Sequence, residues 1–294
     1  ANRLPNYRLF RESLKSQGLP LAAVELVHDG GPFELEESDA EILVQRRGGD
    51  GLWQKERLLN VALECLPDDC DKVVWVDADV LFENRHWVAD TAALLEQYVF
   101  VQPFSLAFRL EAGCTTVGDP HLARPGSAYC WSRRQGWYGG MPGLAMSTRR
   151  EILKEYGLYD RLILGAADRV ILSAAMGIDA ARSPDIKELP ASLVADARQW
   201  ASRVAEVAGG SLQCAAGNLF HLWHGTVAGR RYTKQPRLLR DFEVHEDIRV
   251  DAAGAWSWAT DKPAMHDRIR RYFLSRNEDG KPRLPWWRRW LAPF

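Results

Sequence analysis

The stretch that decides the fold is KVVWVDADVLF, residues 72–82, in which a short apolar run is followed at once by two aspartates. Residues 73–76 are all β-branched or aromatic, which predicts a strand covered on both faces. Asp77 and Asp79 follow at its carboxyl end, the end at which open α/β sheets bind their ligands. The stretch therefore predicts a buried strand that delivers two carboxylates to a ligand-binding crevice.

Two carboxylates this close repel each other unless a positive group lies beside them. A hard divalent cation supplies that charge, because carboxylate oxygens suit Mg²⁺, Mn²⁺ and Ca²⁺. A cation held by one or two carboxylates keeps open positions, which phosphate oxygens commonly fill. The pair thus indicates a metal–diphosphate site, while the alternative is that the aspartates serve only the chemistry of a turn.

Composition narrows the classes of protein. The chain has 294 residues, of which 46% are hydrophobic and 26% charged, and this allows one large α/β domain or a domain with an appendage. A net charge of −1 gives no global basic field for nucleic acid. No apolar run has transmembrane length, and the five cysteines have neither disulfide nor zinc spacing. We therefore expect no transmembrane segment and a reducing, cytoplasmic location.

Helical and strand patterns alternate around the aspartates, which favours a largely parallel sheet. The long segment 105–140 has little periodicity and is expected to form loops. Helices are predicted at residues 4–17, 52–66, 87–98, 148–156, 167–176, 196–208 and 263–276, and strands at 21–27, 42–44, 73–76, 99–104, 143–146 and 219–223.

A second candidate residue is Asp168, which ends the sequence GLYDRLILGAAD, residues 157–168. Gly165, Ala166 and Ala167 are small, so a substrate could approach the carboxylate closely. The first turn of a helix favours an ionised carboxylate through the helix dipole. Asp168 is therefore either a reactive carboxylate or a helix cap.

Two histidines form a third candidate group in HLWHG, residues 221–225. If a strand runs through them, residues three apart point to opposite faces. At most one of the pair is then expected beside the aspartates, and the spacing alone leaves open which one.

Taken in order, these motifs resemble nucleotide-sugar glycosyltransferases of the glycosyltransferase-A fold. The order is Asp-x-Asp, a Gly-rich strand, Gly-Leu-Tyr-Asp leading to an acidic residue, and His-Gly followed by Arg and Tyr. The likeness is greatest to inverting family-two enzymes and to the carboxy-terminal half of β-1,4-galactosyltransferases, and it covers about residues 20–240. It implies a Rossmann-like, mostly parallel central sheet flanked by helices, with a carboxy-terminal extension.

The resemblance also implies roles. Asp77, Asp79 and His224 would hold Mn²⁺ or Mg²⁺ and, with it, the diphosphate of a nucleotide-sugar donor, most simply a UDP-sugar. His224 is chosen because it precedes a charged loop as in the galactosyltransferases, and His221 is then expected to point elsewhere. Asp168 would be the catalytic base of an inverting transfer to an acceptor hydroxyl, on a saccharide, a protein or a modified nucleobase. The chain departs from the family's acidic motif at Arg169, where a second acid is usual, and this bears on the acceptor.

Further binding residues are expected on loops. Trp137, in a Gly-rich segment, is a candidate platform for a sugar ring, and Arg230 and Arg231 are candidates to pair with phosphate oxygens. We expect residues 1–240 to form the catalytic domain and residues 241–294, basic and aromatic near their end, to form a helical extension packed on it.

Two other readings stay open. In a phosphohydrolase of the haloacid dehalogenase type, Asp77 would be the nucleophile and Asp79 the acid and base. That family usually has its motif at the start of the fold, whereas two strands are predicted before it here. The third reading is a non-catalytic protein that binds sugar or nucleic acid through its twelve tryptophans and its basic end.

Overall fold

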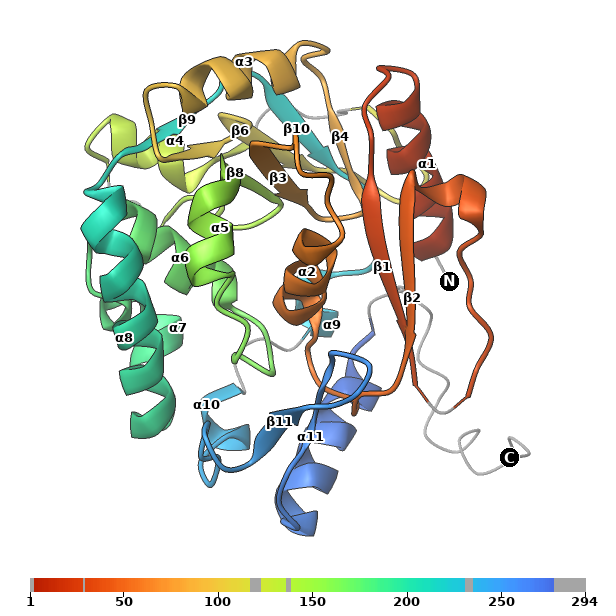
Figure 1. The fold of residues 1–294 in the computed structure, drawn as a ribbon, viewed down its shortest axis with the longest axis vertical. Helices are drawn as coiled ribbons and strands as arrows, with labels where there is room; N and C mark the ends of the chain where they lie inside the picture. Colours follow the sequence, from red (N-terminus) through yellow and green to blue (C-terminus); the bar gives the residue numbers. More distant parts are fainter. Residues whose placement is uncertain (1–2, 29, 117–122, 136–138, 231–234, 278–294) are drawn as a thin grey trace.

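Two four-stranded sheets of mixed direction form the centre of the fold, and helices flank them (Figure 1). The computed structural model of the chain describes residues 3–28, 30–116, 123–135, 139–230 and 235–277. The strands are β1 (Ala22–Val27), β2 (Ile42–Arg47), β3 (Lys72–Val76), β4 (Val80–Phe82), β5 (Phe100–Gln102), β6 (Leu106–Arg109), β7 (Ala123–Pro125), β8 (Ala145–Arg149), β9 (Leu212–Cys214), β10 (Asn218–His221), β11 (Ile248–Val250) and β12 (Trp256–Trp258).

Helices cover these sheets and confirm each predicted helix, although the ends differ by a few residues. The α-helices are α1 (Arg3–Lys15), α2 (Lys55–Glu64), α3 (Trp87–Leu95), α4 (Ser127–Ser132), α5 (Arg150–Tyr156), α6 (Ala167–Met176), α7 (Pro184–Lys187), α8 (Ala191–Ala208), α9 (Val227–Arg230), α10 (Gln235–Leu238) and α11 (Pro263–Ser275), and two 3₁₀ turns lie at Glu37–Asp39 and Ala180–Arg182. None of the helices in the described ranges combines the length and the apolar character needed to cross a bilayer.

The expectation of a mostly parallel sheet is wrong. The first sheet has the order β3-β8-β5-β9, and β8 runs antiparallel to both of its neighbours. The second has the order β4-β10-β6-β7, with β6 parallel to β10 and the outer two strands antiparallel to theirs. Strand β8 forms backbone hydrogen bonds with the facing edges of both β3 and β5. Its direction depends on the long connection that precedes it, and the periodicity of a short stretch of sequence does not reveal that direction.

Strand β3 is covered on both faces, as its composition predicts. Val73 and Trp75 pack in the larger hydrophobic cluster, and Val74 and Val76 pack in the smaller one. The period-2 alternation of a strand produces this division. Helix α1 closes the smaller cluster, in which Tyr7, Phe10 and Leu14 meet residues of both sheets.

The segment 105–140 was expected to form loops, but its described part contains β6, β7 and α4. Strand β6 is stabilised by β10, which lies more than a hundred residues further along the chain. Because a four-residue strand carries little periodicity, its partner rather than its own sequence decides that it forms.

Residues beyond 240 contribute to the larger cluster through side chains of the segment after α10, of the β11–β12 hairpin and of α11. The hairpin is also hydrogen-bonded to the start of α2. The Gln54 side chain accepts from the Trp256 N–H at 2.8 Å and donates to its carbonyl at 2.7 Å. The domain division at residue 240 stays a prediction.

Phe242 tests how strongly this region supports the fold. Its side chain is fully buried, so Phe242→Ala should lower the free energy of unfolding by about 3–5 kcal/mol. Urea denaturation followed by circular dichroism measures this. The control Leu274→Ala, at a side chain 71% exposed, should change it by less than about 0.5 kcal/mol. A separate, early transition in the parent would contradict the prediction.

Candidate functional site

The turn at residues 77–79 carries the chain from β3 in one sheet directly into β4 in the other. The Asp77 N–H donates to the Leu144 carbonyl at 2.7 Å, which extends the pairing of β3 with β8. The Asp79 carbonyl accepts from the Leu222 N–H at 2.8 Å, which extends the pairing of β4 with β10. Each aspartate is therefore fixed by a different sheet.

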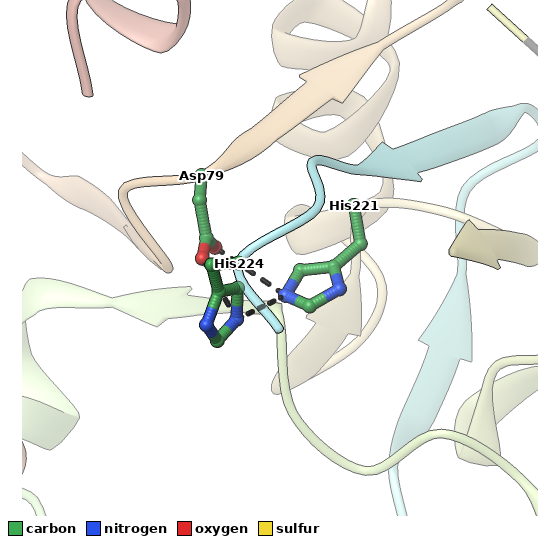
Figure 2. A group of neighbouring side chains, drawn as sticks. All are labelled: Asp79, His221 and His224. Carbon is green, nitrogen blue, oxygen red and sulfur yellow. Dashed lines mark hydrogen bonds and ion pairs between the residues drawn. The ribbon is translucent and has the colours of Figure 1, made fainter. Parts of the chain in front are cut away.

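Asp79 lies against both histidines, and Figure 2 shows the three side chains converging. Its Oδ2 is 3.2 Å from Nε2 of His224, and its Oδ1 is 3.5 Å from Nε2 of His221. The two Nε2 atoms are 3.2 Å apart. His221 and His224 are buried, and Asp79 is partly exposed, so the group is open on the carboxylate side.

The prediction that His221 points elsewhere is wrong. It assumed that a strand continues through both histidines, but β10 ends at His221. Residues 222–224 lie outside any strand, so the rule of alternating faces does not apply to them. The chain bends after Leu222, whose N–H is held by Asp79, and both imidazoles reach the same carboxylate.

The distances suit a single divalent cation. Ligand atoms bonded about 2.1 Å from one ion lie about 3.0 Å apart at right angles and about 3.4 Å apart at the tetrahedral angle. The three observed separations, 3.2, 3.2 and 3.5 Å, fall around this range. Two imidazole nitrogens and one carboxylate oxygen suit Mn²⁺, Fe²⁺ or Zn²⁺ better than Mg²⁺, which prefers oxygen ligands.

Asp77 occupies a different place from the predicted one. Among the described residues, the group able to hold a metal consists of Asp79, His221 and His224, and it does not include Asp77. The Asp77 Oδ1 atom lies 3.2 Å from Nζ of Lys55 instead. The alternation that would place residues two apart on one face ends with β3, because residues 77–79 form a turn.

Lys55 and Asp168 form the second part of the site. The Lys55 Nζ atom is 3.1 Å from Oδ1 of Asp168 and 3.4 Å from Oε1 of Glu56. Lys55 begins α2, and Asp168 lies in the first turn of α6, as predicted. Although burial acts to lower it, the carboxylates of Asp168, Asp77 and Glu56 hold the pKa of Lys55 well above its usual value.

Glu56 lies behind this pair and is buried. Burial raises its pKa to about 7, against the opposing effect of the Lys55 ammonium. Its Oε2 accepts from the indole N–H of Trp53 at 3.0 Å, which fixes the carboxyl group. Glu56 therefore changes charge near neutral pH without facing the pocket.

A pocket opens beside Asp168, and its polar lining comes from Lys55, Asp77 and Asp168. Gly143 lies directly against the Asp168 carboxylate, because a Cβ there would be 2.5 Å from Oδ2 of Asp168. Leu144 and Ala166, which flank this contact, both have left-handed backbones, with φ of 76° and 79°. Such strain in residues other than glycine gathers at functional sites.

Several predicted residues lie elsewhere. Trp137 and Arg231 fall outside the described residues. Arg230 is the last residue of α9, and its side chain is outside the description. Sequence reasoning missed Lys55, although a signal for it exists. A cation in the first turn of a helix opposes the helix dipole, so it needs a carboxylate partner elsewhere.

No protein-family model matches the chain, and no curated protein matches it.

Glu56 predicts a pH-dependent stability. The folded state holds its proton more tightly than the unfolded state does, so its contribution is complete below about pH 4.5 and is lost as the pH rises through about 7. Glu56→Gln removes this titration. The melting temperature of the parent should therefore fall relative to that of Glu56→Gln between these pH values, and level off above them.

Differential scanning fluorimetry from pH 4.5 to 8.5 measures this difference. Glu64→Gln, at an exposed position of the same helix, is the matched control. An offset between Glu56→Gln and the parent that does not depend on pH would contradict the prediction.

Proposed function

We propose that this protein is a metal-dependent glycosyltransferase that moves a sugar from a nucleotide diphosphate sugar to an acceptor hydroxyl with inversion. The observation that carries the proposal is the pairing of two sites across one turn. Asp79 contacts two histidines at distances that suit a cation. Asp77 forms an ion pair with Lys55, which also forms an ion pair with Asp168.

The residues have separate tasks in this reaction. Asp79, His221 and His224 would hold Mn²⁺, and two imidazole ligands favour it over Mg²⁺. A divalent cation there would neutralise the charge that develops on the leaving diphosphate. Asp168, which lines the pocket beside Gly143, would accept the proton of the acceptor hydroxyl as it attacks.

A glycosyltransferase-A-like fold, with residues 1–240 as the catalytic domain and 241–294 as an extension, belongs to the same proposal. It is supported by the position of the site, which lies beyond the carboxyl ends of β3 and β10. The UDP-sugar donor rests on the sequence resemblance. The five cysteines are free of disulfides, which supports a reducing, cytoplasmic location.

A phosphohydrolase with Asp77 as nucleophile is the second candidate. The ion pair between Lys55 and Asp77 favours it, because a nucleophilic carboxylate must stay ionised. Against it, the second aspartate faces two imidazoles instead of a position where it could protonate a leaving group. Hydrolysis of a simple aryl phosphate by the parent, without turnover of nucleotide sugars, would favour this candidate.

The metal site gives the first test of the proposal. Mn²⁺ should raise the melting temperature of the parent, and a UDP-sugar should raise it further, because each stabilises the folded state by mass action. Asp79→Ala and His221→Ala should each weaken Mn²⁺ binding by at least about 100-fold, since loss of even an outer-shell group costs 10–100-fold. Isothermal titration calorimetry measures the affinities.

His86→Ala, which removes an exposed imidazole, is the control and should bind Mn²⁺ as the parent does. If His221→Ala also binds Mn²⁺ as tightly as the parent, the contacts around Asp79 are hydrogen bonds, with imidazole N–H groups donating to its carboxylate.

Asp168→Asn tests the base. It keeps the shape of the side chain and removes its basicity, so turnover should fall about 10²–10⁴-fold while donor binding stays intact. Asp185→Asn, at an exposed carboxylate that pairs with Arg169 nearby, is the matched control. NMR of the product anomer checks inversion. Undiminished turnover in Asp168→Asn would place the base elsewhere, and retention of configuration would contradict a single displacement.

A further inference from the structure

Lys55 occupies a position that helix chemistry does not favour. It is the first residue of α2, where the positive end of the helix dipole repels an ammonium. Its side chain is 24% exposed, and it nevertheless turns toward the pocket. Ion pairs with carboxylates offset the unfavourable interaction of the Lys55 ammonium with the helix dipole. The position of this lysine is therefore explained by the candidate site and not by the helix.

Three elements meet at the Lys55 ammonium. Asp77 comes from the β3–β4 turn at 3.2 Å, Asp168 from the start of α6 at 3.1 Å, and Glu56 from α2 itself at 3.4 Å. Arg169, next to the base, is directed to Asp185 on α7 at 3.3 Å. Asp77 and Asp168 are far apart in the sequence, and the Lys55 ammonium bridges their carboxylates.

We propose that Lys55 is a positioning residue, which holds the Asp168 carboxylate in place relative to Asp77 until the acceptor arrives. The inference rests on the proposed function, in which Asp168 is the base. A base must lie within hydrogen-bond reach of the proton that it accepts, and the ion pair with the Lys55 ammonium at 3.1 Å fixes the direction of the Asp168 carboxylate. The raised pKa of Lys55 keeps that charge present throughout the neutral range.

The bridge also links the two halves of the site. Asp77 and Asp79 belong to one three-residue turn, and Lys55 pairs with both Asp77 and Asp168. The bridge therefore connects the turn that carries the proposed metal ligand Asp79 with the proposed base.

Three variants test the inference. Lys55→Met removes the charge and keeps an apolar side chain of similar length, Lys55→Arg keeps the charge, and Lys72→Met is the matched control. The Lys72 side chain is 23% exposed and also bridges two carboxylates, Asp71 and Glu96, each at 2.8 Å. The measurements are kcat and KM for the nucleotide sugar that the parent turns over in the presence of Mn²⁺.

In Lys55→Met, kcat should fall by about 100-fold while KM for the nucleotide sugar stays unchanged, because a catalytic group displaced by about 1 Å loses rate by such a factor. Lys55→Arg, which keeps the ion pair, should recover most of kcat, and Lys72→Met should leave kcat unchanged. An unchanged kcat in Lys55→Met, or a loss that Lys55→Arg does not recover, would overturn the inference.

A second measurement does not depend on activity. Urea unfolding of the parent, Lys55→Met, Asp168→Asn and the double variant gives the coupling free energy between the two side chains. Coupling that favours the pair supports the bridge, and its absence overturns the inference. An inactive parent with a coupled pair would contradict the proposed function while supporting the bridge, so the two failures are distinguishable.

Discussion

The structure depends on the turn at residues 77–79, which two sheets hold from opposite sides. Backbone hydrogen bonds fix Asp77 to the segment before β8 and Asp79 to the segment after β10. Because the polypeptide passes from one sheet to the other within three residues, two neighbouring carboxylates are delivered to two different sets of partners. A continuous strand would have placed both aspartates on one face. Either the two histidines or the Lys55 ammonium would then lack an aspartate partner from this turn.

The two sets differ in the charge that they meet. On the Asp79 side lie two buried imidazoles, with nitrogen atoms at distances from the carboxylate that suit a cation. On the Asp77 side, a lysine pairs with carboxyl groups from three elements, and burial raises the pKa of Glu56, which favours its neutral form. Leu144 and Ala166 have left-handed backbones beside this second set. These two residues violate the usual backbone preference of residues other than glycine, and they do so beside the proposed site. Such local strain is common at functional sites, where a fold gives up some stability.

The sequence predicted secondary structure well where periodicity was long. Helices α2, α6 and α11 carry clear apolar faces, and β3 carries a β-branched and aromatic run, so their own residues determine them. Prediction failed for β6 and for the direction of β8, which depend on partners far along the chain. A short strand is stabilised by the edge that it completes, and that edge is not visible in a local window.

For the candidate site, the sequence by itself determined the chemical groups: Asp77, Asp79, Asp168 and a histidine pair in an order that suits a metal and a base. The tertiary structure alone decided how they are grouped. In the folded chain His221 lies beside His224, Asp77 pairs with Lys55, and Glu56 is buried. The physical reason is that side-chain direction follows from spacing only inside a regular element. Residues 77–79 and 222–224 lie outside such elements, where hydrogen bonds to distant segments set the direction.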